Sequence, residues 1–86
     1  MEPIEKMRTI WRTVFEQEDM PADADFFQLG GDSLKATVLM LHVEEKFGVI
    51  VDPVEVFETP VLGELADKIA RFCDSEFANA IENRAL

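Results

Sequence analysis

The chain has 86 residues, 48% of them hydrophobic, which suits one domain with a core and is too apolar for a disordered chain. Its net charge of −10 is concentrated in residues 16–67, where 13 residues are acidic and two are basic. This acidity argues against nucleic acid and membrane partners and favours proteins with basic patches, although it would also simply keep a small domain in solution.

Cysteine usage and the lack of long apolar runs bear on the cell compartment. Cys73 is the single cysteine, so no internal disulfide can form, and a reducing compartment is favoured. No apolar run is long enough for a signal peptide or a membrane span. We therefore expect a cytoplasmic monomer with one domain over residues 1–86. Its core should lie at about residues 4–73, with residues 74–86 as a C-terminal extension that could continue the last helix and fray.

The first predicted helix covers residues 3–17, where apolar residues recur at helical spacing. The periodicity stops at residues 19–32, and Pro21, Gly30 and Gly31 mark a long loop. This loop also holds three large apolar residues, Phe26, Phe27 and Leu29. A free tether would not need them, so we expect the loop to lie across the core.

The second predicted helix begins at Asp32, a favoured N-cap, and runs to about Phe47, before a glycine suited to a left-handed C-terminus. At 100° per residue its apolar side chains form two groups. The expected core face consists of Ala36, Leu39, Met40, Val43 and Phe47. The opposite side carries Leu34, Val38 and Leu41, with Glu44 and Glu45 beside them. This second face could be an exposed docking surface for another protein, or the long loop could cover it.

Two further helices complete an all-α prediction. Asp52 and Glu55 fit the two ends of a capping box around Pro53, which favours a short third helix that ends before Pro60. Thr59 is the expected cap of the last helix, whose core stripe is Leu62, Leu65, Ala66, Ile69 and Phe72. Cys73 follows this stripe and is expected to be a buried structural thiol. No segment alternates as a strand over enough residues, so the expected fold has three main helices and one short helix.

Ser33 is the most informative side chain. It follows two glycines, whose missing side chains allow unusual backbone angles and the close approach of another molecule. It also falls in the first turn of a helix, where unpaired N–H groups and the helix dipole favour a phosphate. No His or Lys is placed nearby as a catalytic triad would need. From the residues alone, Ser33 is either a modification acceptor or a serine that only supports the helix cap.

Residues 26–36 read Phe-Phe-Gln-Leu-Gly-Gly-Asp-Ser-Leu-Lys-Ala and resemble the phosphopantetheine attachment signature of acyl and peptidyl carrier proteins. The similarity continues through residues 47–49, 56–60 and 65–66 and spans residues 4 to about 72. It implies a four-helix bundle in which Ser33 receives 4′-phosphopantetheine from coenzyme A, through a phosphopantetheinyl transferase. In this family the acid before the serine, here Asp32, helps to bind magnesium during that transfer.

The resemblance also implies partners. The arm's thiol would carry an acyl, aminoacyl or peptidyl thioester, received from an adenylating loading enzyme and delivered to downstream synthases. Family partners bind the second helix, which makes Leu34, Val38, Leu41, Glu44 and Glu45 the candidate contacts. The glycine pair is most similar to carriers of nonribosomal peptide and related secondary metabolism. Val61 departs from the threonine that many relatives have there, which puts the cap of the last helix in doubt. The chain could be a free-standing carrier or a domain taken from a larger protein.

Two other functions compete with a carrier. The string Gly-Asp-Ser-Leu at residues 31–34 also occurs in serine esterases and lipases, but these need a histidine and an acid on an α/β sheet. The single histidine, His42, would lie about 13 Å along the helix axis from Ser33 at about 1.5 Å per residue, so we expect no enzyme. The second competitor is an interaction module with the carrier fold that is never modified. We expect no resident metal site, since the acids lack the spacing of a calcium loop.

Overall fold

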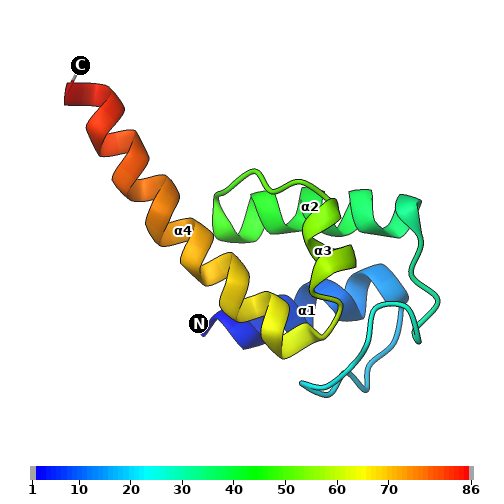
Figure 1. The fold of residues 1–86 in the computed structure, drawn as a ribbon. Coiled ribbons are helices and arrows are strands. Elements are labelled where there is room, and N and C mark those ends of the chain that lie inside the picture. Colours follow the sequence, from blue (N-terminus) through cyan, green and yellow to red (C-terminus); the bar gives the residue numbers. More distant parts are fainter. Residues whose placement is uncertain (1, 86) are drawn as a thin grey trace.

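The computed structural model describes the backbone of residues 2–85 and the side chains of residues 2–73. It contains the helices α1 (Pro3–Phe15), α2 (Ser33–Phe47), α3 (Val54–Glu58) and α4 (Leu62–Ala85) (Figure 1). The described backbone has no strand, only a single antiparallel bridge between Asp25 and Val61. The prediction of an all-α fold with three main helices and one short helix is confirmed.

Helix α1 packs against both α2 and α4, and α2 returns antiparallel to α1 (Figure 1). The short α3 crosses between α2 and the beginning of α4. The long loop at residues 16–32 leads from the end of α1 to the start of α2, so Ser33 lies at the end of the bundle where this loop meets α2. No helix among the described residues combines the length and apolar character needed to cross a bilayer.

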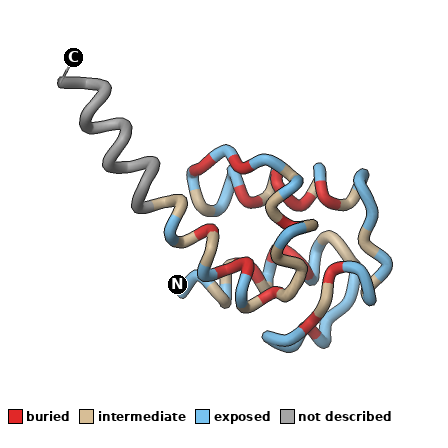
Figure 2. Tube along the Cα trace, viewed as in Figure 1, coloured by how far each residue is buried: buried red, intermediate tan, exposed pale blue. Residues whose placement is uncertain are grey.

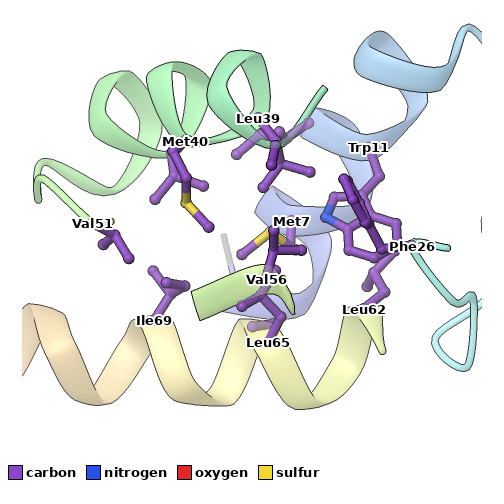
Figure 3. Close-up of a cluster of buried hydrophobic side chains, with 14 of the residues drawn as sticks. Met7, Trp11, Phe26, Leu39, Met40, Val51, Val56, Leu62, Leu65 and Ile69 are labelled. Atoms are coloured by element: carbon purple, nitrogen blue, oxygen red, sulfur yellow. The ribbon is translucent and has the colours of Figure 1, made fainter. Parts of the chain in front are cut away.

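The core collects apolar side chains from all four helices and from the long loop (Figures 2 and 3). No polar or charged residue is buried in the described part of the chain. The predicted core face of α2 is confirmed, since four of its five side chains are buried and Phe47 packs half-buried against them. The predicted stripe of α4 is buried from Leu62 to Ile69, and Phe72 is half-buried.

Two side chains expected in the core are more exposed than predicted. Phe27 is 49% exposed and stacks on half-buried Phe57 of α3, with ring centroids 5.8 Å apart. Cys73 is half-buried, and its thiol lies 3.6 Å from the Phe47 carbonyl oxygen, to which it donates. Helix α4 continues past Cys73 to Ala85, as the spacing allowed. The expected fraying concerns residues 74–86, whose side chains lie outside the described part.

The ends of α1 and α3 differ from their predictions. Helix α1 ends at Phe15, two residues early, because Glu16 adopts a left-handed backbone with φ of 53°. The N-cap of α3 is Pro53, which has no side-chain cap, and Asp52 just before it supplies the expected bond, since its Oδ1 accepts from the Val54 N–H at 2.9 Å. The second half of the predicted capping box is wrong, because the Glu55 carboxylate pairs with Lys68 Nζ of α4 at 2.6 Å instead.

Thr59 does not cap α4, contrary to the prediction. It ends α3, and its hydroxyl accepts a hydrogen bond from Lys68 Nζ at 3.0 Å. Helix α4 begins at Leu62, where the long loop supplies the missing acceptors. The Leu62 N–H donates to the Ala24 carbonyl and the Gly63 N–H to the Ala22 carbonyl, each at 2.9 Å. These bonds satisfy two of the N–H groups at the start of α4 that have no partner within the helix, so α4 begins after Val61 without a side-chain cap.

Candidate functional site

The site begins with a tight turn in the loop before α2. Asp25 starts it, because its Oδ1 accepts from the N–H groups of Phe27 at 2.8 Å and Gln28 at 3.2 Å. The Gly30 N–H then donates to the Phe27 carbonyl at 3.0 Å, and Gly30 has a φ of 91° that favours glycine. The turn therefore brings the chain to the start of α2 with a fixed backbone path.

The start of α2 leaves Ser33 accessible. Asp32 is the N-cap, and its Oδ1 accepts from the Lys35 N–H at 2.9 Å. Ser33 is the first helical residue, it is exposed, and no described residue makes a hydrogen bond to its hydroxyl. The N–H groups of Ser33 and Leu34 also find no acceptor among the described residues. A phosphate on Ser33 fits here, because it meets unpaired donors, the positive end of the helix dipole and no side chain from the glycine turn.

Nothing in the described structure activates Ser33 as a catalytic nucleophile. His42 is half-buried on the same helix, nine residues away. The described side chains include no group of three or more His, Cys, Asp or Glu that could hold a metal ion. The arrangement therefore offers an accessible hydroxyl with no catalytic base beside it among the described residues.

The second face of α2 is open. Leu34 is 73% exposed and Leu41 is 56% exposed, while Val38 is half-buried. Glu44 and Glu45 are exposed at the same end of the helix as Leu41. The long loop does not cover this face, so the alternative of a loop lying over Leu34 and Leu41 is wrong.

One exposed apolar segment was not predicted. In the connection between α2 and α3, Val49 and Val51 are buried, whereas Ile50 between them is 80% exposed. Val54, the first residue of α3, is 45% exposed. The segment is too short to be a strand, but its side chains alternate between buried and exposed as those of a strand do. A period of two applied to residues 49–51 would have predicted that Ile50 lies on the surface.

The chain matches the family described as the phosphopantetheine attachment site over residues 5–69. It is 35% identical to the nonribosomal peptide synthetase asaC of Aspergillus flavus over 63 residues, which are 73% of this chain and 6% of that protein. It is 33% identical to bacitracin synthase 3 of Bacillus licheniformis over 75 residues, or 87% of this chain and 1% of that protein. The chain thus spans only a small part of these relatives.

Two solved structures have the same fold. The type-II acyl carrier protein BlmI of Streptomyces verticillus, involved in bleomycin biosynthesis, superposes with a TM-score of 0.76 at 21% identity, over 81% of this chain and 84% of that one. A nonribosomal PCP domain superposes with a TM-score of 0.70 at 31% identity, over 78% of this chain and 86% of that one. These matches rule out the serine hydrolase alternative. The chain belongs to the phosphopantetheine-attachment family, as a non-catalytic carrier domain of the type found in nonribosomal peptide synthetases and hybrid PKS-NRPS synthetases.

Proposed function

We propose that Ser33 is the residue that carries the phosphopantetheine arm. The observation that carries this proposal is the exposed hydroxyl in the first turn of α2, beside two N–H groups without partners among the described residues. When bound, the arm supplies a terminal thiol that holds an acyl, aminoacyl or peptidyl group as a thioester. The role of this chain is to present the hydroxyl and to stabilise the phosphate by the helix dipole.

Ser33 acts as the acceptor in a phosphoryl transfer carried out by a phosphopantetheinyl transferase. Its Oγ forms a bond to the phosphorus that bears the pantetheine, and the pyrophosphate P–O bond of coenzyme A breaks. Adenosine 3′,5′-bisphosphate leaves, and the hydroxyl proton passes to a base of the transferase. Asp32 can assist the transfer while it still caps α2. Its Oδ1 accepts from the Lys35 N–H, whereas its Oδ2 has no partner among the described residues and can bind the transferase's magnesium.

Intact mass spectrometry after incubation with coenzyme A, magnesium and a transferase of broad specificity tests the proposal. We expect the mass of the chain to rise by one phosphopantetheinyl group, and digestion should place it on the peptide containing Ser33. A folded chain that stays unmodified with several competent transferases would instead favour the unmodified interaction module.

Delivery of the cargo requires docking to partner enzymes. We infer that the second face of α2, from here on called its outer face, is the docking surface. Leu34, Val38 and Leu41 supply apolar contact area, and Glu44 and Glu45 supply charge for basic patches on partners. The partners in this proposal are the transferase, an adenylating loading enzyme and downstream synthases. A tether combined with weak docking supplies a high effective concentration while still allowing release.

Substitutions at Asp32 should separate its cap from its charge. Asp32→Ala should lower the free energy of unfolding by about 1 kcal/mol, whereas Asp32→Asn should leave it nearly unchanged because asparagine caps equally well. Asp32→Asn should still slow the transfer about tenfold or more at limiting magnesium, since a metal contact contributes several kcal/mol and about 1.4 kcal/mol is already tenfold. Urea unfolding measures the change in the free energy of unfolding, and transfer rates at several magnesium concentrations measure the effect of the charge. Equal rates for wild type and Asp32→Asn at every concentration would remove the magnesium role.

A further inference from the structure

Gly31, two residues before Ser33, lies directly against the ring of Phe26. A Cβ added at Gly31 would come within 2.3 Å of Phe26 Cε2 and 2.5 Å of both Cδ2 and Cζ. Such distances are far inside van der Waals contact, so a side chain here would require the ring or the backbone to move. The close approach that the glycine allows is made by a ring of the same chain, and not by another molecule as the sequence predicts.

The Phe26 ring has no room to retreat. It is completely buried, and four other rings surround it at centroid distances of 5.6–6.1 Å (Figure 3 shows Trp11 among them). These rings belong to Trp11, Phe15, Phe27 and Phe57. The backbone of Phe26 is fixed as well, because its N–H donates to the Pro60 carbonyl at 2.8 Å and its carbonyl accepts from the Gly31 N–H at 2.9 Å.

We propose that Phe26 is a positioning residue for attachment of the arm, and this inference rests on the proposed attachment at Ser33. The buried ring limits the path of the backbone at Gly31, and the next two residues are the cap of α2 and the acceptor serine. Phe26 thereby determines where the Ser33 hydroxyl is displayed, although it does not touch the reacting atoms. The ring links this placement to α1 and α3 through its contacts with Trp11 and Phe57.

Gly31→Ala should therefore slow the transfer without removing the acceptor. The added methyl group cannot displace the enclosed ring, so the turn must shift and carry Ser33 with it. A misplacement of about 1 Å can cost about 100-fold in rate, so we expect kcat to fall by about 10- to 100-fold. KM for the carrier should change little, because the outer face of α2 where the transferase docks in our proposal does not include Gly31. Wild-type kcat for a folded Gly31→Ala variant would overturn the inference.

A double-mutant cycle tests whether the effect runs through the ring. Phe26→Leu removes Cε2 and Cζ and leaves branches that can rotate away from the new methyl group. Adding Gly31→Ala to Phe26→Leu should cost less than about threefold in kcat, far below its cost in wild type, since contacting residues couple. An equal cost in both backgrounds would overturn the proposal. If circular dichroism shows that Gly31→Ala does not fold in either background, the Phe26→Leu variant alone tests the proposal. A wild-type kcat for Phe26→Leu would then overturn it.

The variant Ile69→Ala in α4 is the control for a fall in kcat that comes only from lost stability. Ile69 is fully buried at the opposite end of the core from Phe26, so its truncation destabilises the same core without touching the turn (Figure 3). At a temperature where it is folded, Ile69→Ala should keep wild-type kcat, and a fall equal to that of Gly31→Ala would contradict the inference.

Modification of wild type at Ser33 is measured first. If wild type is not modified there, the proposed function fails, whereas a modified wild type with an unaffected Gly31→Ala variant contradicts only the role of Phe26.

Discussion

Replacing Ser33 with alanine is expected to abolish attachment of the phosphopantetheine arm. The transfer needs a hydroxyl oxygen to bond to phosphorus, and Ser33 has the exposed hydroxyl in the open first turn of α2. The change should cost little stability, because no described residue makes a hydrogen bond to this hydroxyl and the cap is held by Asp32. Intact mass after incubation with coenzyme A and transferase should show no increase for Ser33→Ala and complete conversion for wild type.

Thr37→Ala is the matched control for Ser33→Ala. Thr37 lies one turn further along the same helix, is exposed, and donates its hydroxyl hydrogen bond to the Ser33 carbonyl at 3.1 Å. It presents a hydroxyl of the same chemistry but lies beyond the unpaired N–H groups of the first turn. Thr37→Ala should therefore be fully modified. Continued mass increase in Ser33→Ala, or its loss in Thr37→Ala, would move the attachment to another hydroxyl.

The helices and the two faces of α2 could be predicted from the sequence because their signals are local. Asp32 and Gly48 mark the ends of α2, and the structure finds them as N-cap and left-handed C-cap. The period of 3.6 residues separates buried Leu39 from exposed Leu34 and Leu41. Ser33 is a candidate site for the same reason, since the glycines, the cap and the proposed acceptor are neighbours along the chain.

The features that were missed depend on contacts between distant segments. Thr59 has the chemistry of a cap, but the carbonyls of Ala22 and Ala24 in the long loop take the N–H groups at the start of α4. Glu55 suited a capping box, but Lys68 of α4 offers it an opposite charge. The fit of Gly31 against the Phe26 ring likewise arises only when four other rings hold Phe26 in place. Spacing along the chain does not contain such contacts.

Truncating Leu39 and Leu41 should have opposite effects on stability and on docking. Leu39 is fully buried, so Leu39→Ala should lower the free energy of unfolding by about 2–5 kcal/mol through lost burial and a cavity. Leu41 is 56% exposed, so Leu41→Ala should change it by no more than about 0.5 kcal/mol. Urea unfolding of both variants, fitted with a common m-value, measures this difference.

The same pair of variants tests whether the outer face of α2 is the docking surface. Leu41→Ala removes apolar area that a partner would bury, so KM of the transferase for the carrier should rise by about fivefold, equivalent to about 1 kcal/mol. Leu39→Ala, assayed where it is folded, should leave that KM within about twofold of wild type because its side chain faces the core. KM could instead rise in proportion to lost stability and be larger for Leu39→Ala than for Leu41→Ala. That result would mean that binding depends on the stability of the bundle and not on contact with the outer face. A rise confined to Leu41→Ala requires direct contact, because that substitution leaves the core intact.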